Sequence, residues 1–263
     1  GYDFSMAKII DSSGIDIILV GDSASNVMAG HETTLPITLD QMIYHASSVV
    51  RGVKRALVVV DLPFGSYQSD PNEALRSAIR IMKESGAHAV KMEGGIEIKE
   101  SIIRILNAGI PVMGHLGLTP QTRAKMGGYK VQAKTNDSAK KLLEQAKNIE
   151  ESGASLLLIE AVPEEVSEIV AKELKIPVYG IGAGPRVDGQ LVIVHDILGL
   201  FWEFKPKFIK QFVNGEKFFI DAINAYEKEV HNGNFPGEEH VYKMSEKELN
   251  KLLGMPGSSW KYN

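Results

Sequence analysis

Three acidic residues each follow a short apolar run and are candidates for a shared metal site. Asp22 ends Ile-Asp-Ile-Ile-Leu-Val-Gly-Asp, Asp61 ends Ala-Leu-Val-Val-Val-Asp, and Glu93 ends Ala-His-Ala-Val-Lys-Met-Glu. Such runs, separated by helical stretches, are typical of buried parallel strands, whose carboxyl ends gather the chemistry of α/β proteins. With no cysteine and no histidine pair at helical spacing, this oxygen-only set favours Mg²⁺ over Zn²⁺. Taken singly, each acid could instead be a turn residue, a helix cap or an ion-pair partner.

Further polar side chains accompany these acids. Ser23 could hold a substrate carboxylate oxygen or a metal-bound water, and Lys91 shares one strand face with Glu93. His115 follows Ile-Pro-Val-Met-Gly and could be a ligand, an acid or a hydrogen-bonded core residue. Glu160 ends Leu-Leu-Leu-Ile and is the best candidate for general acid or base, since desolvation can bring such a carboxyl group into the working range. A structural salt bridge is the alternative for Glu160.

A magnesium ion at this position suits one kind of substrate. Magnesium uses few carboxylates and keeps open positions, which the carboxylate and ketone oxygens of an α-keto acid can fill by chelation. A cation at the ketone oxygen would stabilise the enolate that forms when the neighbouring proton is removed.

The elements that must position these residues alternate between strand and helix. Helices are expected at Glu73 to Ser85, opened by an Asp70 cap and Pro71, and at Ser138 to Glu151. The strand-like runs lie near 16–20, 56–60, 88–92, 111–114, 155–159, 177–181 and 191–194. The pattern allows an open doubly wound sheet or a closed (β/α)₈ barrel, and the missing Gly-x-Gly-x-x-Gly signature favours the barrel. An eighth strand is expected upstream of Gly1, ending near Tyr2 and Asp3, so the natural protein should begin earlier.

Two segments outside this pattern have their own interpretations. The glycine-rich stretch 176–184 resembles a backbone-amide cradle for phosphate, although Arg186 is the one basic residue near it. We expect a single barrel domain over 1–263, in which 201–263 form a helical C-terminal appendage and polar tail. The aromatic residues of this appendage should cover the barrel wall or a subunit contact rather than bind a ligand. They are Phe201, Trp202, Phe204, Phe208, Phe212, Phe218, Phe219 and Tyr226.

Composition excludes several classes of partner. The chain has 263 residues, 44% hydrophobic and 24% charged, with a net charge of −4 whose signs are mixed along the sequence. This pattern marks neither a nucleic-acid surface nor an anionic-membrane surface, and no apolar run approaches the ~18 residues that span a bilayer. We expect small-molecule partners and a cytoplasmic location.

An ordered series of motifs points to a known family. The motifs are Val-Gly-Asp-Ser (20–23), Gly-His-Glu-Thr-Thr-Leu-Pro-Ile-Thr (30–38), Asp-Leu-Pro-Phe-Gly-Ser-Tyr (61–67), Lys-Met-Glu-Gly-Gly (91–95), Met-Gly-His-Leu-Gly-Leu-Thr-Pro-Gln (113–121), Gly-Gly-Tyr-Lys-Val-Gln (127–132) and Gly-Ile-Gly-Ala-Gly (180–184). The series closely resembles the ketopantoate hydroxymethyltransferase family from Tyr2 to about Phe212 and again over 234–240.

The resemblance implies a fold, a reaction and a set of site residues. The fold is a (β/α)₈ barrel of the phosphoenolpyruvate/pyruvate type. The reaction transfers a one-carbon unit from 5,10-methylenetetrahydrofolate to 3-methyl-2-oxobutanoate through a Mg²⁺-stabilised enolate, giving 2-dehydropantoate for pantothenate synthesis. A homo-oligomer, commonly a decamer, is implied as well. The implied residues are the Mg²⁺ ligands Asp22, Asp61 and Glu93, the keto-acid contacts Asp22, Ser23, Asp61 and Lys91, the pocket residue His115 and the proton acceptor Glu160.

Two other hypotheses remain open at this point. A related barrel lyase or aldolase acting on another 2-oxo acid would use the same enolate chemistry, and Lys91 could form a Schiff base if its ammonium group lost a proton. A non-catalytic barrel that serves as a binding protein would not need an acid at position 160, so the full set of polar strand ends argues against it.

Overall fold

Seven parallel strands form one sheet in which spatial order follows chain order. The computed structural model describes residues 1–128, 130–201 and 206–254. The strands are β1 (Ile17–Val20), β2 (Leu57–Asp61), β3 (Ala89–Glu93), β4 (Val112–Gly117), β5 (Leu156–Glu160), β6 (Val178–Ile181) and β7 (Gly189–Gln190). Each strand pairs in parallel with the next. Helical crossovers connect the strands from β1 to β6, and a loop over 182–188 connects β6 to β7, so the topology is that of a (β/α)₈ barrel. The predicted barrel class is confirmed, while the strand expected before Gly1 stays a prediction.

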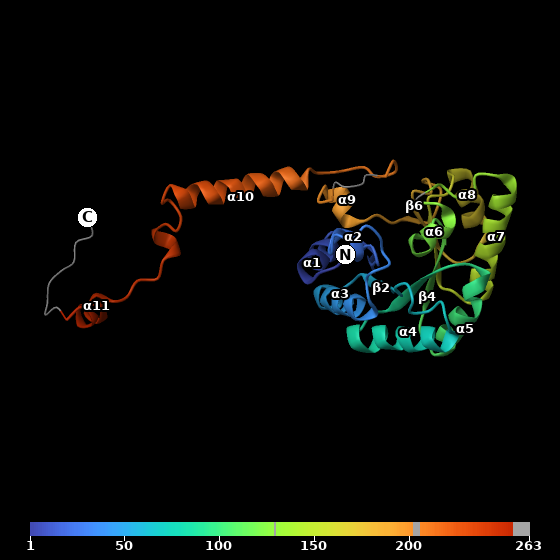
Figure 1. Ribbon diagram of the computed structural model, residues 1–263, viewed down its shortest axis with the longest axis horizontal. Coiled ribbons are helices and arrows are strands. Elements are labelled where there is room, and N and C mark those ends of the chain that lie inside the picture. The colour runs from blue at the N-terminus through green and yellow to red at the C-terminus, as the bar shows by residue number, and fades with distance from the viewer. Residues whose placement is uncertain (129, 202–205, 255–263) are drawn as a thin grey trace. The chain divides into compact units, whose positions relative to one another are not determined.

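Helices cover the outer face of this sheet. The bounds of the helices are α1 (Phe4–Ser12), α2 (Ala24–Val27), α3 (Leu39–Gly52), α4 (Pro71–Ser85), α5 (Lys99–Asn107), α6 (Arg123–Met126), α7 (Asn136–Glu151), α8 (Glu164–Glu173) and α9 (Val194–Leu198). In Figure 1, α3, α4, α5, α7 and α8 follow one another around the outside. The two predicted helices are α4 and α7, and the Asp70 side chain accepts from Asn72 N as expected of an N-cap.

Alternation along the strands explains how polar groups come to face the inside of the barrel. A small apolar cluster contains one inward residue each from five strands: Val59, Ala89, Met113, Leu158 and Ile181. Their neighbours, such as Val58, Val60, Val90 and Met92, pack outward against the helices. Because side chains two positions apart share a face, the next inward residues of β2 to β5 are Asp61, Lys91, His115 and Glu160. The apolar cluster therefore lies directly beneath these four side chains inside the barrel.

One strand prediction was wrong. The run 191–194 was expected to form a strand, but the strand is β7 at Gly189–Gln190, and Val194 already begins α9. Leu191 makes one further backbone hydrogen bond, from its N to Gly180 O at 2.9 Å, and its side chain packs on the inner apolar cluster. Leu191 therefore lines the barrel from a loop, whereas Val192 is exposed and Val194 packs from α9.

The chain divides into two compact units, and the second begins at Asn214. This unit contains α10 (Gly215–His231), a 3₁₀ turn at Glu238–His240 and α11 (Glu246–Leu252). The Asn214 side chain caps α10 by accepting from Lys217 N at 3.1 Å, and the rings of Tyr226 and Phe235 meet edge to face. The predicted single domain with a helical appendage over 201–263 stays a prediction, and Trp202 and Phe204 lie outside the described residues. None of the helices in the described ranges is long and apolar enough to cross a membrane.

A glycine at the end of β4 holds the two strands that carry His115 and Glu160 together. Gly117 has a φ of +88°, and a Cβ there would lie 2.3 Å from the Glu160 carbonyl oxygen. Gly14 has a similar φ of +82° but nothing within 4 Å. We therefore expect Gly14→Ala to cost about 1–2 kcal/mol of unfolding free energy and Gly117→Ala a further ~1–3 kcal/mol from the contact. Urea denaturation of both variants measures the difference, and equal losses would contradict the steric argument.

Candidate active site

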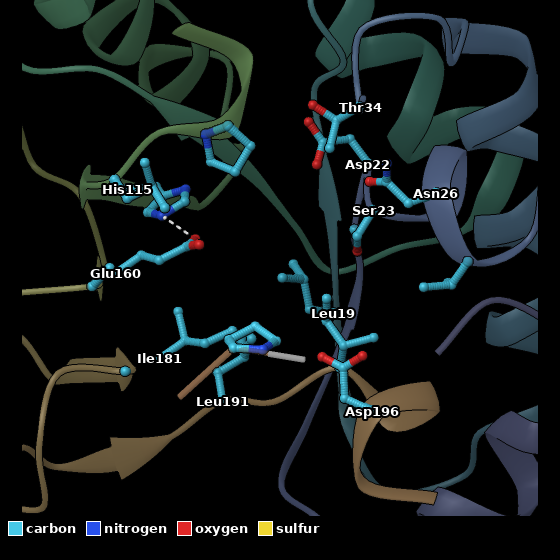
Figure 2. A pocket seen from close by; sticks show the side chains of 18 of the residues that line it. Leu19, Asp22, Ser23, Asn26, Thr34, His115, Glu160, Ile181, Leu191 and Asp196 are labelled. Atoms are coloured by element: carbon cyan, nitrogen blue, oxygen red, sulfur yellow. Dashed lines mark ion pairs between the residues drawn. The ribbon is translucent and has the colours of Figure 1, made fainter. Parts of the chain in front are cut away.

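A pocket opens where the inward polar residues end the strands. Its volume is about 660 Å³, within the usual range for small-molecule sites. Asp22, Asp61, Lys91, Glu93, His115 and Glu160 all line it, so the structure brings together every residue predicted from the strand ends. Figure 2 shows Asp22, Ser23 and Thr34 on one side of the pocket and the His115–Glu160 pair on the other.

Lys91 is the centre of the charged cluster. Its Nζ lies 3.0 Å from Asp61 Oδ1, 3.9 Å from Glu93 Oε1 and 3.1 Å from His115 Nδ1, and its side chain is 3% exposed. Burial lowers the pKa of Lys91, but the charges of Asp61, Glu93 and Asp22 outweigh burial and carry that pKa well above its usual value. Lys91 is therefore a permanent cation.

Asp22 is held by a backbone contact and by a glutamine that the sequence did not single out. Asp22 N donates to Asp61 Oδ2 at 2.9 Å, and Gln121 Nε2 donates to Asp22 Oδ2 at 2.9 Å. Burial, followed by the charges of Asp61 and Glu93, raises the pKa of Asp22 well above its usual value. Asp22 is thus the carboxyl group of the cluster that most needs an additional positive partner.

Gln121 and Tyr67 join the ends of three strands. Gln121 N donates to Glu93 Oε2 at 3.0 Å, and the Tyr67 hydroxyl donates to Gln121 Oε1 at 2.8 Å. The same hydroxyl also accepts from Glu93 N at 3.1 Å. Both residues are the last of a motif that carried the family resemblance, and membership of these motifs was the signal by which the sequence could have identified them. Their contacts show that they orient Asp22 and Glu93 through hydrogen bonds.

His115 connects the charged cluster to Glu160. An ammonium group can only donate, so its contact with Lys91 requires a lone pair on Nδ1 and places the ring proton on Nε2, which lies 3.2 Å from Glu160 Oε2. Burial and the charge of Lys91 lower the pKa of His115, but the carboxylates of Glu160 and Glu93 outweigh them and raise that pKa above its usual value. His115 Nε2 thereby faces the Glu160 carboxylate, whose side chain is 15% exposed, at the pocket wall.

The donor set fits a divalent cation by charge and chemistry. Three carboxylates, each at most 4% exposed, face Lys91, the one buried cationic side chain among the described residues, so negative charge is in excess. Asp61 Oδ1 and Glu93 Oε1 have no partner at hydrogen-bond geometry. As they stand, however, no three His, Asp or Glu side chains in the described ranges are grouped closely enough to hold an ion. A small shift of the carboxylates from Lys91 is therefore required for binding.

Ser23 and Thr34 add hydroxyl groups to the same side of the pocket. Ser23 Oγ lies 2.8 Å from the hydroxyl of buried Tyr2, and Gly21 permits this approach because a Cβ there would meet Ser23 Oγ at 2.9 Å. Thr34 is 3% exposed and its Oγ1 has no hydrogen-bond partner among the described residues. The sequence singled out Ser23 but not Thr34.

The glycine-rich stretch has a packing role. A Cβ at Gly182 would meet the Phe208 ring at 2.5 Å, and one at Gly184 would meet Glu164 Cβ at 2.3 Å. Arg186 pairs with Glu168 at 2.6 Å and with Glu164 at 3.6 Å. The close packing explains why glycine is required at 182 and 184, and the Arg186 guanidinium is already paired with two glutamates. The geometry therefore does not favour a phosphate site at this stretch.

Asp196 is a pocket carboxyl group that the sequence interpretation missed. Burial raises its pKa from 3.8 to about 6. Between these pH values the unfolded chain releases its proton first, so folding stability falls as the pH rises through the window and the cost persists above pH 6. Asp196→Asn should therefore increase the unfolding free energy at pH 8 by about 2–3 kcal/mol more than at pH 4. Urea denaturation at both pH values checks this, and a gain that does not depend on pH would contradict it.

Comparison with known sequences gives a consistent result. The sequence model of the family described as "Ketopantoate hydroxymethyltransferase" matches residues 1–238. The 3-methyl-2-oxobutanoate hydroxymethyltransferase of Cytophaga hutchinsonii is 62% identical over 241 residues, covering 92% of this chain and 89% of that protein. The enzyme of the same name from Salinibacter ruber is 54% identical, covering 92% and 91%.

Solved structures agree on the fold. A phosphonopyruvate hydrolase in complex with oxalate and Mg²⁺ has a TM-score of 0.57 and 13% identity, covering 97% of this chain and 88% of that one. A 2,3-dimethylmalate lyase of the PEP mutase/isocitrate lyase superfamily has a TM-score of 0.57 and 14% identity, with coverage of 97% and 87%. At these low identities the structural likeness shows the barrel fold alone and says nothing about substrate.

Proposed function

The chain belongs to the ketopantoate hydroxymethyltransferase family, and we propose that it transfers a hydroxymethyl group from 5,10-methylenetetrahydrofolate to 3-methyl-2-oxobutanoate, giving 2-dehydropantoate. The observation that carries this proposal is the pocket in which three buried carboxylates and Lys91 face the His115–Glu160 pair. One side of the pocket suits the oxygens of a keto acid, and the other suits removal of its proton.

The charged side of the pocket binds and polarises the keto acid. Asp22, Asp61 and Glu93 are the residues that would hold Mg²⁺, which when bound stabilises negative charge on the ketone oxygen. Lys91 provides a permanent positive charge for the substrate carboxylate, and the hydroxyl of Ser23 can donate to an oxygen of the same group.

Glu160 removes the proton at C3 of the keto acid. His115 Nε2–H fixes the Glu160 carboxylate by one oxygen and leaves the other free to accept the proton. The electron pair released at C3 forms the new bond to the methylene carbon, and water supplies the hydroxyl group as tetrahydrofolate leaves. The 660 Å³ pocket exceeds what this small keto acid fills, which leaves room for the second substrate.

The alternative as a Schiff-base aldolase is disfavoured by the state of Lys91. A lysine that forms a Schiff base must lose its proton, whereas three carboxylates raise the pKa of Lys91. The alternative as a non-catalytic binding barrel conflicts with the family to which the chain belongs. A homo-oligomer and a cytoplasmic location stay predictions.

The proposal is tested by turnover with both substrates, with and without Mg²⁺. Asp61→Asn should raise the Mg²⁺ concentration needed for half-maximal activity by roughly 10-fold or more, because an amide oxygen carries less charge than a carboxylate oxygen. Asp16→Asn is the control, since Asp16 is 86% exposed and pairs with Arg55 at the surface. An unchanged Mg²⁺ titration would exclude Asp61 as a ligand, and absence of turnover in the parent would overturn the proposed reaction.

A further inference from the structure

Asp196 is a buried acid that faces the pocket without a partner among the residues that the structure describes. It lies in the first turn of α9, is 8% exposed and lines the pocket. No residue in the described ranges makes a hydrogen bond or ion pair with its carboxylate, and burial raises its pKa to about 6. The acids of the charged cluster, by contrast, have Lys91, Gln121 or His115 beside them. A buried carboxylate requires donors, and a ligand in the pocket can supply them.

The surroundings of Asp196 define what such a ligand looks like. Leu19 of β1, Ile181 of β6 and Leu191 line the same pocket, and Phe208 lies over Gly182 at its wall. Its neighbour His195 packs on the ring of Tyr2, with 5.4 Å between ring centroids. In Figure 2, Asp196 lies beside Leu19 and apart from the His115–Glu160 pair. Apolar walls with one carboxylate fit a flat heteroaromatic ring that presents adjacent N–H donors on one edge.

We propose that Asp196 recognises the pterin ring of the one-carbon donor by accepting hydrogen bonds from its 2-amino group and its N3–H. These two donors lie side by side, at the spacing that the two oxygens of a carboxylate accept. The inference rests on the proposed function, in which this donor is a folate. With the pterin edge at Asp196, the rest of the donor extends through the pocket toward the carbon that Glu160 deprotonates.

The first test measures folate binding apart from catalysis. Asp196→Asn has nearly the same shape but offers one acceptor and one donor, so the dissociation constant for tetrahydrofolate should increase roughly 10- to 100-fold. The KM for methylenetetrahydrofolate should increase similarly. The KM for the keto acid and the folate-independent exchange of its C3 proton with deuterium should stay at parent values. Glu165→Gln is the control, because Glu165 is exposed and does not line the pocket, and it should bind tetrahydrofolate as the parent does.

A second probe identifies the edge of the ring. The parent should bind tetrahydropterin more tightly than the analogue with a 2-oxo group, and Asp196→Asn should lose this preference. Unchanged tetrahydrofolate affinity in Asp196→Asn, or a preference that survives the substitution, would overturn the inference alone. A parent that binds tetrahydrofolate but neither exchanges the C3 proton nor turns over would overturn the proposed reaction, while the titration still decides the role of Asp196.

Discussion

Glu160→Gln is expected to lower turnover by roughly 10²–10⁴-fold, because the amide cannot accept the C3 proton that the carboxylate removes. The glutamine oxygen can still accept from His115 Nε2–H, which now lies 3.2 Å from Glu160 Oε2, so the pocket should keep its shape. The measurement is kcat together with the rate of deuterium exchange at C3 without folate, and both should fall. The KM for the keto acid should change little, since the charged cluster that binds it is intact.

The control for this substitution is Glu165→Gln, which removes an exposed carboxylate in the first turn of α8. It should leave both rates at the parent level. A parent-like exchange rate in Glu160→Gln would refute the assignment of Glu160 as the base and leave the proposed overall reaction standing. A lower rate of hydroxymethyl transfer with an unchanged rate of deuterium exchange at C3 would show that Glu160 acts in a step after proton removal.

Lys91→Met is expected to destabilise the fold by about 3–5 kcal/mol, because it leaves Asp61 and Glu93 buried without their cation. The pKa values of Asp22 and Asp61, already raised chiefly by burial, should rise further. Urea denaturation at neutral pH measures the loss of unfolding free energy. Added Mg²⁺ should recover part of it if the carboxylates bind the ion, since binding to the native state alone stabilises that state.

The matched control is Lys147→Met, which removes an ion pair with Glu173 in which both side chains are about half exposed. Exposed pairs contribute only ~0–1 kcal/mol, so this variant should stay close to the parent. Lys91→Arg, which keeps the charge, should recover more stability than Lys91→Met. Equal stability of Lys91→Met and Lys147→Met would show that the buried carboxylates are compensated by something other than Lys91.

The sequence was sufficient to predict the barrel and the residues at the strand ends. An apolar run of four or five residues must be buried, and the period of two along a strand determines which side chain faces inward after it. Asp61, Lys91, His115 and Glu160 each stand two positions beyond an inward apolar residue, so their common location follows from local pattern and parallel topology. The prediction of a strand at 191–194 was wrong because Leu191 is buried although it lies in a loop. An apolar residue in the sequence indicates burial but does not distinguish a buried loop from a buried strand.

The sequence by itself therefore determined which inward residues would meet at the mouth of the barrel, and the motif series determined the family. Only the tertiary structure decided which of these residues contact one another and which other residues face them across the pocket. Gln121 reaches Asp22 across 99 positions of the chain, and Asp196 faces the pocket from a five-residue helix. Gln121 lies in a 3₁₀ turn beyond β4, and Asp196 follows the run 191–194, which forms a loop and the start of α9, so strand periodicity does not place either side chain in the pocket. Their roles arise because chain folding buries a polar group, and a buried polar group must find a partner.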